Sequence, residues 1–149
     1  MMRTALVVGT LLLCAGAVMA DQDIAITQQN LMKTQGKSMY GVFGKILKGE
    51  SPYDQAAVNA ALADLEVQVT KIATVFTPNP KEDVANANFG ASQKIWQNKA
   101  DFDSKIPPVS KALADVKGKI KDSASLKVAF DAILEKCTGC HDTYRVKLK

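Results

Sequence analysis

Histidine, cysteine and aromatic residues are scarce in this chain of 149 residues, which has one histidine, three cysteines and 6% aromatic side chains. A structural zinc site takes about four cysteine or histidine ligands, so the scarcity of both argues against one. Beyond the first 20 residues no stretch approaches the roughly 20 apolar residues that span a bilayer. Alternating strand patterns and Asn-Gly hairpin signals are also lacking. These absences disfavour a zinc protein, a membrane-spanning protein and a β-rich fold.

The N-terminal segment has the pattern of a signal peptide. Arg3 precedes an apolar run from Ala5 to Leu13, and small residues flank Met19 in Val18-Met19-Ala20. This order of a basic start, an apolar middle and a small-residue site is typical of exported proteins. We expect cleavage after Ala20, so that residues 1–20, with Cys14, are removed and residues 21–149 form one domain. In a bacterium that domain is expected in the periplasm, with no membrane insertion of the mature chain.

The mature chain carries only a small positive charge. Without Arg3 it has 18 basic and 15 acidic side chains, and its lysines are scattered rather than clustered among aromatics. Nucleic-acid-binding domains concentrate lysine and arginine on one face. The sequence therefore predicts no nucleic-acid partner.

Helices are predicted throughout the mature chain, because apolar residues recur every three or four positions. The first expected helix covers 24–47, and the second runs from a cap at Ser51 or Asp54 to Phe76. The third covers about 92–120, and the last runs from a cap at Asp122 or Ser123 to Tyr144. Polar residues 81–93 form the longest connection. Four helices with mostly short links predict an all-α, antiparallel up-down-up-down four-helix bundle.

Two adjacent prolines interrupt the third of these helices. A proline inside a helix removes a hydrogen bond and clashes with the preceding turn. We therefore expect a kink or break at Pro107-Pro108, with helix resuming from about Val109 to Ile120.

One motif near the C-terminus carries chemistry: Cys137-Thr138-Gly139-Cys140-His141. Two thiols and an adjacent imidazole at this spacing form the attachment signature of c-type haem. Three other interpretations fit less well. The chain lacks the second Cys/His pair that a zinc site needs and the βαβ context of a thioredoxin-like motif, and a disulfide would leave the adjacent His141 unexplained. We therefore predict one haem c, attached covalently through Cys137 and Cys140, with His141 as the proximal iron ligand because no other histidine exists.

The second axial position has two candidate ligands. Only Met32 and Met39 remain after cleavage, both on the first helix. In an antiparallel bundle the start of the first helix lies beside the end of the last, which places Met32 level with His141. Met39 would lie about 10 Å further along at 1.5 Å per residue. Geometry thus favours Met32 as a metal ligand, and the competing interpretation is an ordinary core methionine.

Two glutamines lie one turn before Met32. Gln28 and Gln29 are placed to bond a haem propionate or to line the pocket. The alternative is that both are simply solvated.

Several segments together resemble the class II c-type cytochromes, the cytochrome c′ family. The attachment motif followed by Arg145 is similar to the terminal motif of that family, and Ile95-Trp96 with Phe102 is similar to its third-helix signature. Residues 31–39 and 48–54 resemble the low-spin branch, cytochrome c-556. Pro107-Pro108 depart from the family pattern.

This resemblance covers essentially the whole mature chain and implies roles for several residues. It implies a four-helix bundle with haem near the C-terminus and Met32 as the distal ligand. It also implies that Trp96 and Phe102 pack in the core near the haem. For Arg145 we expect either pairing with a propionate or shielding of the proximal face, since its planar fork suits carboxylates; the alternative is a solvated arginine.

These expectations point to a protein that moves electrons rather than to an enzyme. With histidine and methionine both on iron, no position stays open for a substrate, and the thioether raises the reduction potential. The predicted function is one-electron transfer with redox proteins of the periplasm. The alternative is a five-coordinate, high-spin haem that binds nitric oxide or carbon monoxide. A further candidate partner is a second copy of the chain, bound through the first two helices as a homodimer.

Overall fold

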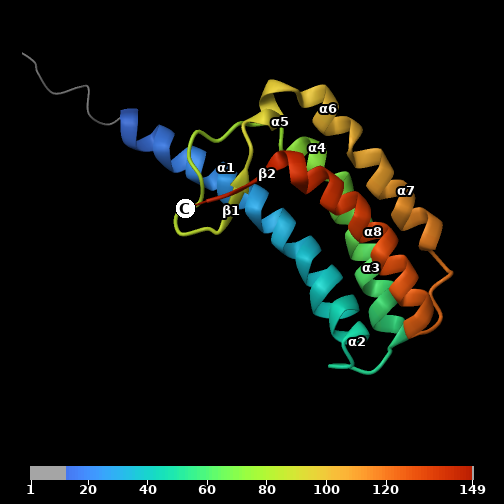
Figure 1. The fold of residues 1–149 in the computed structure, drawn as a ribbon. Coiled ribbons are helices and arrows are strands. Elements are labelled where there is room, and N and C mark those ends of the chain that lie inside the picture. Colours follow the sequence, from blue (N-terminus) through green and yellow to red (C-terminus); the bar gives the residue numbers. More distant parts are fainter. Residues whose placement is uncertain (1–12, 149) are drawn as a thin grey trace, which may run out of the picture.

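The computed structural model describes the backbone of residues 13–148 and the side chains of residues 21–148 (Figure 1). Residues 1–12 of the predicted signal peptide and Lys149 lie outside the described residues. The first rod is continuous through three segments, namely α1 (Leu13–Gly36), the π-helix η1 (Lys37–Gly44) and α2 (Lys45–Leu47). It begins earlier than the expected Ile24, because residues 13–23 include Leu13 and three alanines, which favour helix, and no proline.

The π-helical stretch η1 is a feature that sequence periodicity does not predict. It spans eight residues and buries Met39 and Phe43. π-helical turns are rare and frequently occur at functional sites. Here η1 lies within the rod that carries both candidate methionine ligands.

The second helix is α3 (Gln55–Thr70), followed after a turn at Lys71 by the short α4 (Ile72–Val75). Asp54, and not Ser51, caps α3, since its side chain accepts hydrogen bonds from the amides of Ala56 at 2.8 Å and Ala57 at 3.1 Å. A carboxylate in this position satisfies amides that the first helical turn leaves free.

The third helix is divided into α5 (Lys94–Gln97), α6 (Lys99–Ser104) and α7 (Ile106–Val116). The predicted break exists, but it lies at Lys105, and helix resumes at Ile106 instead of Val109. Both prolines occupy the first turn of α7, where a missing amide hydrogen costs nothing and the fixed φ angle is already helical. The expectation that the prolines themselves interrupt the helix was therefore wrong.

The last helix, α8 (Ser123–Tyr144), begins with a capping box in which Asp122 and Ser125 exchange hydrogen bonds. After it, β2 (Arg145–Lys147) pairs antiparallel with β1 (Phe89–Ala91), with Gly90 opposite Val146. The sequence indicated no strands. Strands of three residues are too short to show an alternating pattern.

The four rods pack as the predicted antiparallel bundle. In Figure 1, α3 returns beside the first rod, α7 runs back beside α3, and α8 returns between α7 and the first rod. The largest fully buried side chains come from all four rods: Phe43, Val58, Val69, Ile95, Leu113, Leu126 and Ile133. No helix within the described residues is both long and apolar enough to cross a membrane.

Candidate haem site

The attachment motif lies on the last two turns of α8. Cys137, Cys140 and His141 are half-buried, while Thr138 and Gly139 between them are exposed. Residues three and four apart share one face of a helix, so both thiols and the imidazole face the bundle together. No disulfide joins Cys137 and Cys140.

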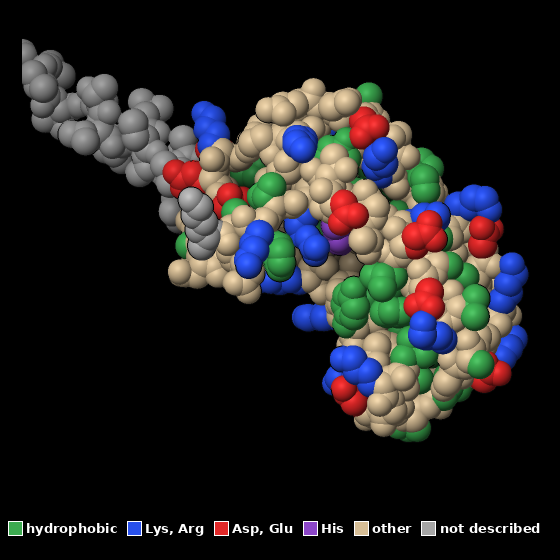
Figure 2. Space-filling view, in the orientation of Figure 1, with side chains coloured by type: hydrophobic (Ala, Val, Ile, Leu, Met, Phe, Trp, Pro, Cys, Tyr) green, Lys and Arg blue, Asp and Glu red, His purple; other side chains and the backbone are tan. Residues whose placement is uncertain are grey.

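These three residues line a cavity of about 660 Å³. It lies between the first rod, α8, α6–α7 and the loop that precedes α5. Its walls are largely apolar, and a cavity of this size suits a cofactor. In Figure 2 the histidine is visible within a hollow on this face, with basic, acidic and hydrophobic side chains near it. The apolar lining includes Met32, Met39, Ile72, Phe76, Ile95, Phe102, Ile106, Val109 and Leu134.

Burial governs the protonation of the motif. Burial raises the pKa of the Cys137 thiol to about 11, and nearby Cys140 adds to this. Burial also raises the pKa of Cys140. Burial lowers the pKa of His141, and Arg145 lowers it further. At neutral pH both thiols are thus protonated before haem is attached, and His141 is the neutral imidazole that coordinates metals.

Both candidate methionines reach the cavity. Met32 is half-buried and Met39 is 4% exposed, and both side chains line the wall opposite α8. Met39 belongs to the buried core, whereas Met32 packs at its edge. The structure therefore brings Met32 and His141 to one cavity, but Met39 lies in the same wall.

The two predicted glutamines differ. Gln28 is 3% exposed, and its amide nitrogen donates to the carbonyls of Val75 at 3.2 Å and Pro78 at 2.9 Å. It thereby fastens α1 to the end of α4. Both glutamines line the cavity, and Gln29 is half-buried.

Two orphaned polar atoms show that the cavity suits a group with a polar edge. Within the described residues, the buried side-chain atoms without a hydrogen-bond partner are Gln28 Oε1 and Gln35 Nε2, and both residues line the cavity. Such atoms are costly unless a ligand or water satisfies them. The Gln35 amide is a donor suited to a carboxylate. An apolar cavity with two thiols, one imidazole and this donor fits haem c.

The aromatic residues are divided between cavity and core. Phe102 lines the cavity, with its ring 5.6 Å from Phe76 and 5.1 Å from Tyr144. Trp96 is not among the lining residues. Its indole nitrogen donates to the Phe76 carbonyl at 3.1 Å, so Trp96 supports the cavity wall from behind, where its neighbour Ile95 is the lining residue.

Arg145 lies just past α8, on the rim of the cavity. Its side chain is exposed, and its guanidinium carbon lies 4.6 Å from the centre of the Phe89 ring. Its backbone amide donates to the His141 carbonyl. Arg145 is thus neither simply solvated nor remote from the site.

Several lining residues were missed by sequence reasoning. Residues 83–91 supply a large part of the wall, and Tyr40 and Lys105 also line the cavity. Residues 81–93 were expected only as a polar connection. Gly90 is the one signal in this segment that indicates a close backbone approach.

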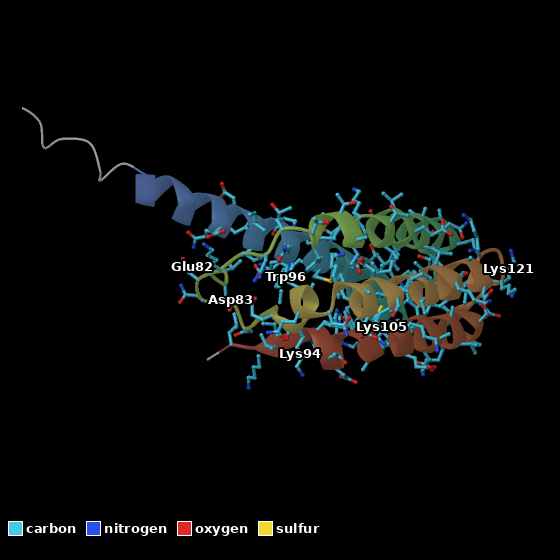
Figure 3. All side chains as sticks on the ribbon, turned by 90° about the horizontal axis from the view of Figure 1, so that it is seen from above. Glu82, Asp83, Lys94, Trp96, Lys105 and Lys121 are labelled. Atoms are coloured by element: carbon cyan, nitrogen blue, oxygen red, sulfur yellow. The ribbon has the colours of Figure 1, made fainter. Side chains whose placement is uncertain are left out.

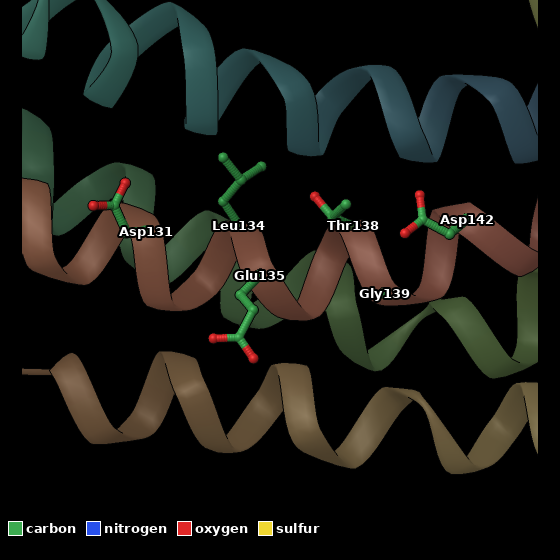
Figure 4. A pocket seen from close by; sticks show the side chains of 6 residues that line it. All are labelled: Asp131, Leu134, Glu135, Thr138, Gly139 and Asp142. Atoms are coloured by element: carbon green, nitrogen blue, oxygen red, sulfur yellow. The ribbon is translucent and has the colours of Figure 1, made fainter.

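The outer side of the motif is different in character. Asp131, Thr138 and Asp142 point to one side of α8, and Glu135 to another, around a shallow depression (Figure 4). Glu135 pairs with Lys136 at 2.6 Å. Within residues 21–148 no cluster of histidine, cysteine and acidic side chains is arranged to hold a metal ion by itself.

Comparison with known proteins places this site in a family. The family model described as Cytochrome C′ matches residues 23–145. Cytochrome c-555 of Bradyrhizobium diazoefficiens is 62% identical over the full length of both chains. Cytochrome c-556 of Rhodopseudomonas palustris is 43% identical over 99% of both.

Solved structures agree with this placement. The structure of oxidized cytochrome c556 from R. palustris superimposes with a TM-score of 0.73 at 38% identity, covering 86% of this chain and 99% of that one. Cytochrome c′ from the same organism gives 0.73 at 32% identity, covering 85% and 98%. The predicted bundle, the family resemblance and haem c as cofactor are confirmed. The chain therefore belongs to the cytochrome c′ family and is a monohaem c-type cytochrome.

Proposed function

We propose that the mature protein, residues 21–149, is a periplasmic one-electron carrier whose haem iron is held between His141 and Met32. Haem c supplies a reversible one-electron iron couple. Two protein ligands leave no coordination position for a substrate and keep the iron environment nearly unchanged between oxidation states. The observation that supports this proposal most is the presence of Met32 on the wall of the cavity that His141 lines.

The chain's own residues suit this task. The Met32 thioether is a soft ligand that raises the reduction potential. Apolar walls such as Phe102 and Ile95 act in the same direction, because a low-dielectric site disfavours the additional charge of ferric iron. His141, kept neutral by burial, is ready to bind iron without first losing a proton. Partners of such a carrier are other redox proteins.

Two features support the periplasmic location. The N-terminal sequence has the pattern of a cleavable signal peptide, and haem c is attached on that side of the inner membrane. We propose cleavage after Ala20, which mass spectrometry of the mature holoprotein would test. Its oligomeric state, including the homodimer considered from the sequence, is measured by sedimentation of the same sample.

A redox titration and a measurement of carbon monoxide binding together test the carrier function. The expected result is a reversible one-electron wave and slow, incomplete binding of carbon monoxide to the ferrous protein, because Met32 must first leave the iron. Rapid, tight binding of carbon monoxide would instead support the five-coordinate alternative.

A further inference from the structure

The chain continues past the haem helix into a short tail, residues 145–148. Figure 1 shows β2 leaving the end of α8 and reaching β1 near α1. We call residues 80–91, which end in β1, the cavity loop. The tail and the cavity loop are far apart in sequence, but the tail is hydrogen-bonded to residues 88–91 at the end of the loop.

Backbone hydrogen bonds hold the tail to the cavity loop. The ladder pairs Phe89 with Lys147 and Ala91 with Arg145. Beyond its two ends, the Leu148 amide donates to the Asn88 carbonyl at 2.9 Å, and the Ser92 amide donates to the Tyr144 carbonyl at 2.9 Å. In the part of the chain that the structure describes, the tail is the one distant segment to which the cavity loop is hydrogen-bonded.

Side chains reinforce this pairing. The Arg145 guanidinium stacks on the Phe89 ring at 4.6 Å, a favourable cation–π contact. The two segments approach closely at Gly90, where a Cβ would displace the exposed Asp83 carboxylate and lie 3.2 Å from Leu148 Cδ2. Figure 3 shows Glu82 and Asp83 on the loop at one end of the bundle, opposite the end marked by Lys121.

The cavity loop is a wall of the haem cavity. Residues 83–91 and Pro80 all line it, and so does Arg145. Most of the loop is exposed on its other side. A wall that lacks a core of its own depends on the contacts that fasten it, and such segments open at low free-energy cost.

We propose that the tail is a strap that keeps the cavity loop closed over the haem, and that Arg145 is a positioning residue that acts through Phe89. The strap limits the entry of water and small exogenous ligands. This inference rests on haem c occupying the cavity, as in the proposed function, but not on Met32 being the distal ligand.

The test compares four holoproteins: wild type, a chain that ends after Arg145, Arg145→Ala, and a charge-matched control. The control carries Lys147→Ala and lacks Lys149, so it loses the same two charges as the truncation but keeps the ladder. Backbone hydrogen exchange of residues 83–91 is measured by mass spectrometry. The rate at which imidazole binds the ferric haem is measured with each chain also carrying Met32→Ala, so that release of Met32 does not limit binding.

We expect exchange in residues 83–91 to be at least about tenfold faster in the truncated chain, intermediate in Arg145→Ala, and unchanged in the control. Imidazole binding should accelerate in the same order. If truncation prevents holoprotein formation, Arg145→Ala and Phe89→Leu provide the same comparison.

Unchanged hydrogen exchange in both the truncated chain and Arg145→Ala would overturn the proposal that the tail is a strap. Faster exchange with unchanged imidazole binding would overturn its role in access. A high-spin wild-type spectrum would contradict the proposed Met32 ligand alone, because the exchange comparison does not depend on the distal ligand.

Discussion

The phenolic hydroxyl of Tyr144 donates a hydrogen bond to the carboxylate of Asp101, which ties the end of α8 to α6. Lys105 pairs with the same carboxylate at 3.2 Å. The Tyr144 ring packs edge-on against Phe102, with 5.1 Å between ring centres. Because Cys140 lies one turn before Tyr144, these contacts of Tyr144 fix the position of the attachment motif along the cavity wall.

Tyr144→Phe removes the hydroxyl and keeps the ring. We expect a lower midpoint of thermal unfolding, because the Asp101 carboxylate loses a donor, and no loss of attached haem. Tyr53→Phe is a matched control, since among the described residues the Tyr53 hydroxyl bonds only to nearby Gln55, at 2.9 Å. Equal midpoints for the two variants would show that the Tyr144 bond does not contribute to stability.

The same bond predicts a pH dependence of stability. The hydrogen bond from Tyr144 lowers the pKa of Asp101 below its ordinary 3.8, so its contribution is present above about pH 4 and lost as the pH falls. The bond to Asp101 raises the pKa of Tyr144 to about 12 from 10.0, so its contribution is present below pH 10 and lost as the pH rises towards 12. The stability difference between wild type and Tyr144→Phe should therefore be constant from about pH 5 to 9 and shrink on both sides. A difference that is flat beyond these limits would contradict the assignment.

Trp96 and Phe102 should behave differently when altered. Trp96→Phe loses the hydrogen bond to Phe76 and should cost about 1 kcal/mol of unfolding free energy, with an unchanged haem spectrum. Phe102→Ala removes a buried ring from the cavity wall and should cost about 3–5 kcal/mol, with a shifted spectrum. Denaturant titration and absorption spectroscopy measure both effects. A spectral shift in Trp96→Phe of the size seen in Phe102→Ala would place the indole in the cavity after all.

Pro107 is expected to stabilise the folded protein. Because it lies in the first turn of α7, Pro107→Ala is expected to destabilise the fold by less than about 1 kcal/mol through the greater freedom of the unfolded chain. If the proline instead strained the interior of a continuous helix, its removal would stabilise by up to about 3 kcal/mol. The sign of the change in denaturant midpoint distinguishes the two.

The sequence was informative wherever a local pattern dictated the outcome. Apolar spacing predicted the four rods, and the spacing of Cys137, Cys140 and His141 predicted that all three share one face of α8. Asp54 and Asp122 appeared among the expected caps because their side chains satisfy free amides of a first turn.

The remaining features depend on contacts between distant segments. The β1–β2 pair joins residues 89–91 to 145–147, and three-residue strands carry no periodicity. Nothing near Arg145 indicated that its guanidinium stacks on Phe89. Gln28 was expected to bond a propionate, to line the pocket or to be solvated. It lines the cavity, but its bonds to carbonyls at the end of α4 could not be foreseen. The π-helix that buries Met39 has no sequence signature either, so the height argument alone could not separate Met39 from Met32.

The most direct test of the central claim is the EPR spectrum of the resting ferric protein, recorded for wild type, Met32→Ala and Met39→Ala. Pairing of Met32 with His141 predicts a low-spin wild type, a high-spin Met32→Ala protein and a low-spin Met39→Ala protein. A high-spin wild type, or a change to high spin in Met39→Ala but not in Met32→Ala, would contradict it.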